Sequence, residues 1–585
     1  MPRRLILINW LSFLKTPHPG RFSFSGFNVA VSVLLSAVLL LLAWLQPFHS
    51  LPWVSWHSEI LAFLAVVLLS WSGLLYVVKQ ASPTPIALPV SAFPFLALTL
   101  VAWFQAATGL LAFRGDAMVL TGYLGVCVAC LTLGRAGSRD QSSYAVLAIT
   151  VLLAAFGSTI VALAQTFELW ESSLWINRMF TLRRAGANLG QPNQLATLIL
   201  MGLGSLLFLF ESRKVGSMLS VFIVIPLILG LAICESRTSL LTFGVLTIWW
   251  FAKRKSLNLR LSSWAVVLAV IGFMGLFWTV PLLLNEIQQM SGVGGEVNTA
   301  VGTRWVVWPQ LVAAILQRPW WGWGLGQVAT AQNASVHAYS SSESFTYCHN
   351  ILLDIALGVG LPIAGLLLLV SLIWLWRRIL RIKQLASWYC VALILPVAVH
   401  SMLEFPFAYA YFLVPVMLAV GMLDGQLSPR PMVKFGAKPM AGILLVATFL
   451  VMWSIVEYFA IEEDFRVVRF EALQVGKTPD SYTSPNVLLL TQLGALLTGG
   501  RIVPKPGMLE QELQLAREVA LRYPWPATQN RYALSLALNG QPNEAIRQLR
   551  VMRILHGETN YGPIRRYWLN LAHEKYPQLG ELNLP

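Results

Sequence analysis

The sequence predicts an all-α polytopic integral membrane protein with about thirteen transmembrane helices. Hydrophobic residues make up 56% of the 585 residues and charged residues only 11%, whereas a soluble domain usually carries about 25% charged residues. The mean hydropathy is +0.65. Many windows also reach the roughly 20 consecutive apolar residues that cross a bilayer. These observations exclude a soluble globular protein.

Thirteen apolar segments follow one another along the chain, separated by short polar or basic stretches. They cover about 27–46, 59–78, 86–107, 117–133, 143–166, 193–210, 215–234, 238–252, 262–284, 351–376, 387–404, 408–423 and 439–460. The eighth is short for a full crossing. The basic N-terminus leads directly into the first segment, which indicates a signal anchor.

The basic residues predict the orientation of these segments. If the N-terminus is cytoplasmic and the spans alternate, the cytoplasmic stretches contain only Asp140, Glu211 and Asp424 as acidic residues. Their basic residues are Arg3, Arg4, Lys15, Arg21, Lys79, Arg135, Arg139, Arg213, Lys214, Lys253, Arg254, Lys255, Arg260, Arg377, Arg378, Arg381, Lys383, Arg430, Lys434 and Lys438. Cytoplasmic loops are enriched in Lys and Arg. The net charge of +15 is therefore mostly a topology signal, and a nucleic-acid partner is not expected.

The remaining stretches lie outside in this scheme. The two larger outer loops cover about 167–192 and 285–350, and residues 462–585 follow the last span. In this final segment, "RYALSLALNGQPNEAIRQL" predicts two helices joined at Asn539-Gly540, similar to a tetratricopeptide-type hairpin. We therefore expect a membrane domain of residues 1–461 and an outer, helical domain of residues 462–585.

The stretch "RRAGANLGQPNQLATLI" opens the sixth segment with two arginines and three amides. It contains Arg183 and Arg184, followed by Gln191, Asn193 and Gln194. Helix capping alone explains Asn193 equally well, because Asn and Pro are common where helices begin. Three amides beside two arginines nevertheless exceed what a cap requires.

Two further arginines lie near the start of unusual outer stretches. In "CESRTSLL", Glu235 and Arg237 interrupt an apolar run. A short solvated turn would explain them, but ionisable residues at a membrane edge often have a function. Arg304 opens "GTRWVVWPQLVAAILQRPWWGWGLGQ", whose apolar residues and tryptophans predict a helix on the membrane surface. Its final glycines predict a tight turn, because no strand–helix unit surrounds them as a dinucleotide site requires.

Histidines occur in two more outer stretches. His349 precedes the tenth segment in "SFTYCHNILLDIALGVGLP", where a lone histidine more often serves as a cap or an ordinary hydrogen-bonding residue. The stretch "HSMLEFPFAYAYFL" contains His400, Glu404, Tyr409 and Tyr411. An aromatic belt with a helix turn is the alternative explanation for this second stretch.

Taken together, these stretches indicate a site for a lipid phosphate. Arginine keeps its charge and has forked donors that suit phosphate. A neutral imidazole can accept a proton from a hydroxyl near neutral pH. Because both kinds of residue gather at the outer membrane boundary, we expect a substrate with its lipid tail in the bilayer and its phosphate at the surface.

The same stretches resemble the O-antigen ligase and polymerase superfamily. The quoted motifs are "GANLGQPNQLATLI", "ESRTSLL", "GTRW…QRPWWGWGLGQ", "HNILLDIALGVGLPIAG" and "HSMLEFPFAYAYFL". Within the superfamily, the sequence is most similar to bacterial O-linked protein oligosaccharyltransferases of the PglL or pilin-glycosylase type. The resemblance covers most of the chain from about 180 to 425, and it implies a GT-C-like membrane fold with catalysis in residues 1–461.

The resemblance also implies an activity. Such enzymes take a preassembled glycan from undecaprenyl pyrophosphate at the periplasmic face of the bacterial inner membrane. They transfer it to serine or threonine of pilins and other exported proteins. Residues 462–585 would then be a periplasmic helical domain. Neither a metal nor another cofactor is expected, and the partners would be the lipid-linked glycan, the acceptor protein and membrane lipids.

The resemblance assigns roles to individual residues. It implies that His349 is the essential histidine and that Arg237 and Arg304 bind the pyrophosphate. It also implies that Gln191 is a functional glutamine, with Tyr409 or Tyr411 as the functional tyrosine. The stretches themselves add Arg184 for the pyrophosphate and Asn193 and Glu404 for the substrate.

Three alternative functions stay open at this point. An O-antigen ligase would transfer the glycan to lipid A–core, and a polymerase would transfer it to a second lipid-linked glycan. A transporter of lipid-linked glycans would need a polar path through the membrane interior. The expected spans are nearly free of charge, which disfavours transport.

Overall fold

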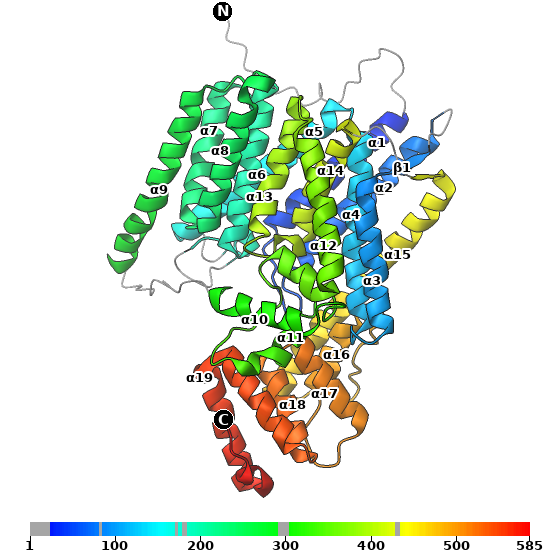
Figure 1. Cartoon of the computed structure of the whole chain (residues 1–585), viewed down its shortest axis with the longest axis vertical. Coiled ribbons are helices and arrows are strands. Elements are labelled where there is room, and N and C mark those ends of the chain that lie inside the picture. The colour runs from blue at the N-terminus through cyan, green and yellow to red at the C-terminus, as the bar shows by residue number, and fades with distance from the viewer. Residues whose placement is uncertain (1–23, 81–84, 170–172, 178–183, 291–303, 428–432) are drawn as a thin grey trace, which may run out of the picture.

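The computed structural model of this chain describes residues 24–80, 85–169, 173–177, 184–290, 304–427 and 433–585. A tall helical bundle forms the upper part of the molecule, and a smaller group of helices lies below it (Figure 1). The basic residues expected at the N-terminus, together with Arg183 and Arg430, lie outside the described residues.

Each of the thirteen expected spans overlaps a helix. The helices are α1 (Phe24–Leu45), α2 (Trp56–Val78), α3 (Phe93–Ala107), α4 (Arg114–Gly137), α5 (Gln141–Thr166), α6 (Pro192–Glu211), α7 (Ser217–Ile233), α8 (Arg237–Leu257), α9 (Ser263–Met290), α12 (Ile351–Ile379), α13 (Leu385–His400), α14 (Ala410–Leu427) and α15 (Ala437–Ala472). Among the described residues, nine helices are long and apolar enough to cross a membrane. The all-α membrane architecture is therefore confirmed, whereas the count of thirteen crossings stays a prediction.

The structure corrects the start of the third span. Instead of a helix from residue 86, the short strand β1 (Ile86–Leu88) pairs antiparallel with β2 (Val433–Phe435). Helix α3 begins only at Phe93. Proline explains the delay, because Pro89 lacks an N–H and disfavours helical backbone in the residue before it. The strand pair ties the entry of α3 to the entry of α15.

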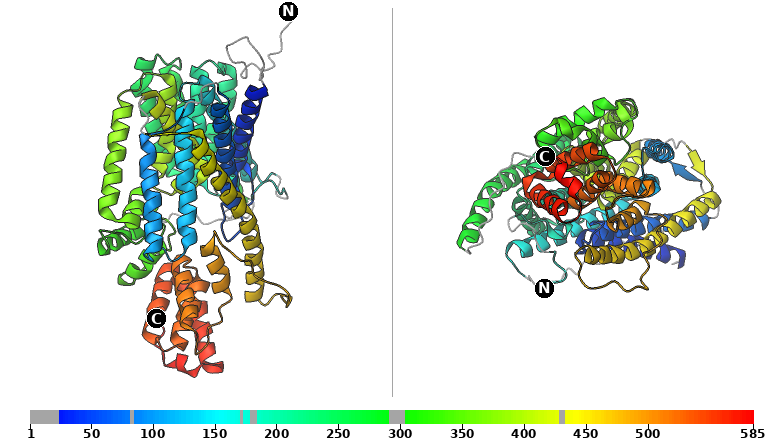
Figure 2. Two further views of the ribbon diagram at one scale, coloured as in Figure 1. Left: turned by 90° about the vertical axis from the view of Figure 1, so that its right-hand side faces the viewer. Right: turned by 90° about the horizontal axis from the view of Figure 1, so that it is seen from below.

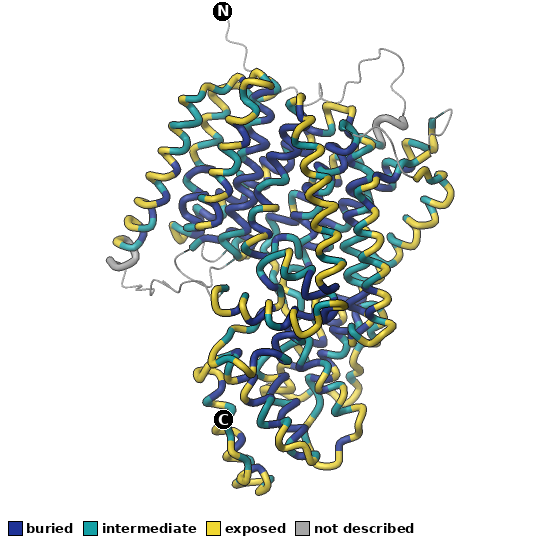
Figure 3. The backbone as a smooth tube through the Cα atoms, viewed as in Figure 1, coloured by how far each residue is buried: buried dark blue, intermediate teal, exposed yellow. Residues whose placement is uncertain are grey.

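Helices α5, α6, α13 and α14 form the centre of the bundle, which Figure 3 shows as mostly buried. In α6, 78% of the residues in the membrane window are buried, against 17% in α9 and none in α15. Glycines bring α4 and α14 together, since a Cβ on Gly134 would lie 2.1 Å from Leu418 O and one on Gly421 would lie 2.3 Å from Leu131 O. Such close backbone contact is typical of small residues between membrane helices.

Helix α12 is interrupted at Gly360, where φ is +80°. The turn that follows α10 (Arg304–Gln317) fills the interruption, and Trp323 N–H donates to Leu357 O at 2.7 Å. A Cβ on Gly360 would lie 2.4 Å from the backbone of that turn, so only glycine fits. The predicted tight turn is confirmed by the positive φ values of Gly322, Gly324 and Gly326.

The lower group of helices packs against the end of the bundle (Figure 2). It comprises α16 (Thr491–Gly500), α17 (Glu510–Arg522), α18 (Pro526–Leu538) and α19 (Pro542–Glu574), with α10 and α11 (Val328–Ser335) between it and the membrane helices. Helices α18 and α19 meet at Asn539 and Gly540, where the sequence predicts a turn. This lower group has a hydrophobic core of its own, which includes Tyr532, Leu549 and Trp568.

Charged pairs fasten the lower helices to the bundle. Arg522 of α17 donates from Nε and Nη2 to the carboxylate of Asp116 in α4, at 3.0 and 2.9 Å. Arg501 contacts Asp464 in the same way at 2.8 and 2.7 Å. Asp464 lies beyond the expected membrane boundary but still within α15, because this helix continues unbroken past residue 461. The two expected domains are therefore joined by a helix rather than by a flexible linker.

Candidate active site

Several helix ends meet where the bundle faces the C-terminal helices. Five helix ends lie at this side of the bundle: the starts of α6, α8, α10 and α12, and the end of α13 (Figure 1). Antiparallel helices joined by loops place alternate ends on one side. The five outer stretches singled out in the sequence therefore converge, although they are far apart along the chain.

Glu404 lies at the centre of this site. It sits in the turn after α13, where its N–H donates to His400 O at 2.8 Å, and its side chain is 7% exposed. Its Oε1 pairs with Arg304 Nη2 and accepts a hydrogen bond from Asn193 Nδ2 at 3.3 Å. Its Oε2 lies 2.7 Å from His349 Nδ1. One carboxylate thus connects an imidazole, a guanidinium and an amide.

Opposing effects act on the Glu404 carboxyl. Burial raises its pKa, but the close contact with His349 and the positive charges around it bring the pKa below its ordinary value. The group is therefore a carboxylate at neutral pH. A carboxylate beside Nδ1 favours the imidazole tautomer with Nδ1 protonated, which leaves Nε2 as the basic nitrogen. Nε2 has no hydrogen-bond partner within the described ranges.

The backbone holds His349 from both sides. The φ of His349 is +54°, a conformation that is uncommon for residues other than glycine. Before it, Trp308 Nε1 of α10 donates to Cys348 O at 2.8 Å. After it, the Asn350 amide donates to Met402 O at 3.0 Å. Asn350 is also the N-cap of α12, so the capping role considered for His349 falls to its neighbour.

Aromatic rings enclose the imidazole. The ring centroids of Phe345 and Phe405 lie 4.4 and 4.7 Å from that of His349. Tyr347 stacks on Phe405 at 5.0 Å. These contacts restrict the orientation of the imidazole, in addition to the contact with Glu404. A strained backbone conformation persists where its surroundings fix it in this way, and such positions often occur at functional sites.

Arg184 and Arg304 belong to the network around Glu404. Arg304 begins α10, and its side chain is 30% exposed. Arg184 donates from Nε to Cys234 O at 3.0 Å and from Nη2 to Asn193 Oδ1 at 3.4 Å. Asn193 therefore links Arg184 to the carboxylate.

Arg237 has different surroundings. It begins α8, three residues after Cys234, the residue that Arg184 contacts. Its side chain is exposed. It makes no hydrogen bond or ion pair with any other residue that the structure describes. The structure thus places Arg237 near the turn that Arg184 holds, without joining it to Glu404, and leaves its guanidinium available to a ligand.

The two amides at the start of α6 differ in role. Gln191 caps the helix, because its Oε1 accepts from Gln194 N–H at 2.9 Å. The capping alternative therefore applies to Gln191 and not to Asn193. The Tyr411 hydroxyl donates to Gln194 Oε1 at 3.1 Å, and the Tyr409 ring lies 5.2 Å from that of Tyr411. Tyr411 is buried, which does not fit an interfacial aromatic belt.

Thr197 also belongs to the site, although none of the sequence motifs indicated it. The fully buried His400 lies with Nδ1 2.7 Å from Thr197 Oγ1. Thr197 follows Asn193 by one helical turn, and His400 precedes Glu404 by the same spacing. Polar residues four positions apart share a helix face. This spacing within apolar segments is the signal that could have indicated Thr197.

The helix that carries Arg304 suits a membrane surface. One face of α10 buries Val307 and Leu311 against the protein, whereas Trp305 and Leu316 on the other face are 74% and 63% exposed. Exposed aromatic and aliphatic groups of this kind lie favourably at the boundary between headgroups and acyl chains. The site thus lies where a lipid phosphate and a water-soluble partner can meet.

The arrangement combines a base with cations. An imidazole oriented by a carboxylate can take a proton from a hydroxyl group. Guanidinium groups can neutralise the charge that develops on a departing phosphate. Together these groups suit the transfer of a phosphate-linked group to a hydroxyl.

Three family models match consecutive parts of the chain. A protein glycosylation ligase model matches residues 185–210, an O-antigen ligase model matches 219–368, and a model of the C-terminal part of a virulence factor membrane-bound polymerase matches 388–563. Each matched region contains part of the site. The first contains Asn193, the second Arg304 and His349, and the third Glu404.

Two curated proteins of Acinetobacter baylyi are similar to the chain. A general O-oligosaccharyltransferase is 27% identical over 561 residues, which are 91% of this chain and 94% of that protein. A ComP-specific O-oligosaccharyltransferase is 30% identical over 384 residues, which are 63% of this chain and 67% of that protein. The first similarity covers nearly the full length of both chains.

Proposed function

The chain belongs to the O-linked oligosaccharyltransferases of the O-antigen ligase superfamily, and from this premise we propose its substrates and the roles of its residues. The donor is a preassembled glycan on undecaprenyl pyrophosphate. The acceptor is a serine or threonine of pilin or of another exported protein. The observation that carries the proposal is the contact of one buried carboxylate, Glu404, with both His349 and Arg304.

His349 acts on the acceptor. A serine or threonine hydroxyl is a weak nucleophile, and a positioned base typically contributes about 10²–10⁴-fold to the rate. With Nδ1 against Glu404, Nε2 takes the hydroxyl proton while the oxygen attacks the anomeric carbon. The resulting imidazolium is stabilised by the carboxylate, as in other histidine–carboxylate pairs.

The arginines act on the donor. As the new bond forms, the bond between the anomeric carbon and the phosphate oxygen breaks, and its electron pair leaves with undecaprenyl pyrophosphate. Arg304, Arg184 and Arg237 neutralise the charge on this leaving group without a metal ion. Attack on the face opposite the pyrophosphate inverts the anomeric centre.

The remaining predicted residues contact the substrates or shape their binding site. Asn193 connects Arg184 with Glu404 and thus fixes the distance between the donor and acceptor groups. Gln191, Tyr409 and Tyr411 shape the adjoining side at the start of α6 and α14. The C-terminal helices, which pack close to the site, help to select the acceptor protein. In the orientation favoured by the basic loops, this side of the inner membrane is the periplasm.

The most direct test is transfer by the purified protein in nanodiscs. An undecaprenyl-pyrophosphate-linked glycan is offered with pilin, with lipid A–core, or with a second lipid-linked glycan, and each product is measured by mass spectrometry. We expect the glycan on serine or threonine of the pilin, also with a chelator present. Transfer to lipid A–core alone would instead identify a ligase, and extension of the second lipid-linked glycan alone would identify a polymerase. Either result would contradict the proposal.

A further inference from the structure

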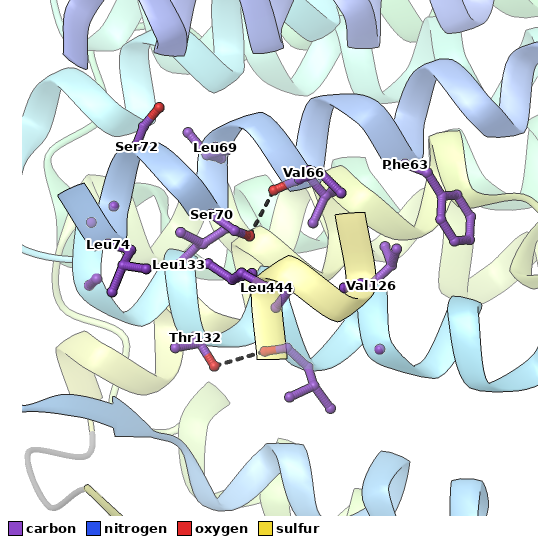
Figure 4. A pocket seen from close by; sticks show the side chains of 18 of the residues that line it. Phe63, Val66, Leu69, Ser70, Ser72, Leu74, Val126, Thr132, Leu133 and Leu444 are labelled. Atoms are coloured by element: carbon purple, nitrogen blue, oxygen red, sulfur yellow. Dashed lines mark hydrogen bonds between the residues drawn. The ribbon is translucent and has the colours of Figure 1, made fainter. Parts of the chain in front are cut away.

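A large apolar cavity lies between α1, α2, α4, α5 and α15. Its volume is about 1890 Å³. Arg135 and Arg139, beside the last turn of α4, line one end, and Trp56 and Glu59, in the first turn of α2, line the other. The cavity therefore follows α2 and α4 from one membrane face to the other. Figure 4 shows side chains of α2, α4 and α15 around it.

Several hydroxyl groups in the cavity walls are already bonded. The hydroxyls of Ser70, Ser72 and Thr132 donate to carbonyls of their own helices at 2.7, 2.8 and 2.8 Å. Two of these bonds are drawn in Figure 4. Because these hydroxyl protons are used within the helices, the walls present hydrocarbon to the cavity. Such a surface favours an apolar occupant.

Helix α15 forms one side of the cavity, although it is hardly buried itself. None of the residues in its membrane window is buried inside the protein. It touches α2, for example through Trp71 Nε1, which donates to Thr448 Oγ1 at 2.9 Å. Leu444 and Val451 of α15 line the cavity. In a membrane, the space between α15 and the bundle therefore suits a hydrocarbon chain.

The outer end of the cavity adjoins the candidate active site. Glu59 lines this end, and its side-chain Oε2 accepts from Ala410 N–H at 2.6 Å. The next residue, Tyr411, donates its hydroxyl proton to the start of α6, where Asn193 contacts Glu404. The start of α14 thus has the cavity on one side and the network around Glu404 on the other.

We propose that this cavity holds the polyprenyl chain of the lipid-linked donor, with its pyrophosphate directed over the start of α14 towards Arg184 and Arg304. This assignment rests on the proposed function. The cavity crosses a hydrocarbon core of about 30 Å, whereas each acyl chain of a phospholipid spans about half of it. A single long chain anchored at the outer face fits this length better. The outer end also adjoins the groups assigned to a pyrophosphate.

The test uses a pair of matched glycine variants of the full chain in nanodiscs. Gly125 of α4 lines the cavity, and a Cβ added to it would lie more than 4 Å from every described atom outside its own stretch of helix. Gly125→Phe therefore introduces a large side chain at a position where the Cβ itself has space. Gly244 of α8 is equally unobstructed but lies outside the cavity, so Gly244→Phe is the control. Two donors with the same glycan are compared, one on undecaprenyl and one on farnesyl pyrophosphate.

We expect Gly125→Phe to raise the KM for the undecaprenyl donor roughly tenfold, equivalent to about 1.4 kcal/mol. The KM for the farnesyl donor should stay the same, and Gly244→Phe should change neither. Equal KM values in wild type and Gly125→Phe, or a parallel rise for both donors, would overturn the assignment. If thermal unfolding shows that Gly125→Phe is destabilised, Gly125→Leu provides the same comparison with a smaller side chain. If the wild type uses neither donor, the proposed function itself fails.

Discussion

The contacts of Glu404 determine how its neighbours can act. The carboxylate touches His349 with one oxygen and Arg304 with the other. It therefore couples the group proposed to act on the acceptor to a group proposed to act on the donor. A substitution that keeps its shape but removes its charge should affect catalysis more than substrate binding.

Glu404→Gln is expected to lower kcat by about 10²-fold, which is within the range of rate enhancement that a positioned base contributes. The glutamine can still hydrogen-bond, but it no longer stabilises an imidazolium. The KM for the acceptor should change little, because no acceptor contact is removed. Glu343→Gln, at an exposed position in the loop that carries His349, is the control. A Glu404→Gln enzyme with the wild-type kcat would show that His349 works without the carboxylate.

The same variant should change how stability depends on pH. Because the pKa of Glu404 is below its ordinary value of 4.5, its ionised form stabilises the fold above about that pH. This stabilisation is lost as the pH falls through the lowered pKa. The difference in melting temperature between wild type and Glu404→Gln should thus be constant near neutral pH and decrease in acid. A difference that does not vary with pH would be inconsistent with an ionised Glu404.

Arg304→Lys and Arg237→Lys should each reduce transfer sharply, by about 10²-fold, the typical loss when one preorganised donor to a developing anion is removed. Lysine keeps the charge but lacks the planar fork that suits phosphate. Arg114→Lys, at an exposed outer position at the start of α4, is the control. Initial rates are measured at matched protein levels. Wild-type rates in both variants would argue against a phosphate role.

The sequence could predict which residue types gather at the outer helix ends, but not how they pair. His349, Glu404 and Arg304 occur in three separate stretches, and nothing in the spacing shows that one carboxylate contacts both others. Likewise, the cap of α6 is Gln191 and not Asn193, because the 3₁₀ turn at Ala187–Leu189 sets where the helix begins. Such pairings depend on tertiary packing.

Among the elements, α19 is connected to the loop that carries His349. The side-chain amides of Asn333 in α11 and Gln548 in α19 bond to each other in both directions, at 2.9 and 3.3 Å. Ser342 N–H donates to Ile554 O of α19 at 3.1 Å. The neighbouring Gln332 accepts from Phe345 N–H at 2.9 Å. The C-terminal helices therefore help to hold the ring that packs on His349.

Gln548→Met should lower kcat several-fold while leaving the KM for the lipid donor unchanged, because the buried Asn333 amide loses its partner and the loop loosens. The double variant Asn333→Leu/Gln548→Met removes both polar groups. Such a replacement can be nearly neutral, so the double variant should recover most of the lost activity. Gln511→Met, exposed on α17, is the control. A double variant as impaired as the single one would count against a positioning role for this pair.

The helix pattern followed from apolar run length, but two element-level features did not. Helix α3 starts late because the strand pair of β1 and β2 takes the residues before it. Helix α12 is broken at Gly360 by a turn that arrives from residues before α12 in the chain. Both depend on contacts between distant segments, which periodicity within one segment does not contain.

For the whole molecule, the orientation in the membrane determines which compartment the site faces. The basic loops predict a cytoplasmic N-terminus, and thirteen crossings would place the C-terminal helices in the periplasm. Alkaline phosphatase fused after Pro585 should therefore be active, whereas a fusion after Lys255 in the basic stretch at the end of α8 should be inactive. A C-terminal reporter that works only in the cytoplasm would overturn both the crossing count and the assignment of the site to the periplasm.

The central claim is that His349 delivers a lipid-linked glycan to a hydroxyl of a protein. It is tested most directly by intact-mass spectrometry of pilin after incubation with wild type, His349→Ala and His349→Gln in nanodiscs, with folding and donor binding measured in parallel. The account predicts that the wild type adds the glycan mass, that both variants bind the donor, and that neither transfers at more than about 1% of the wild-type rate, as expected when a general base is lost. Wild-type transfer by His349→Ala would contradict it.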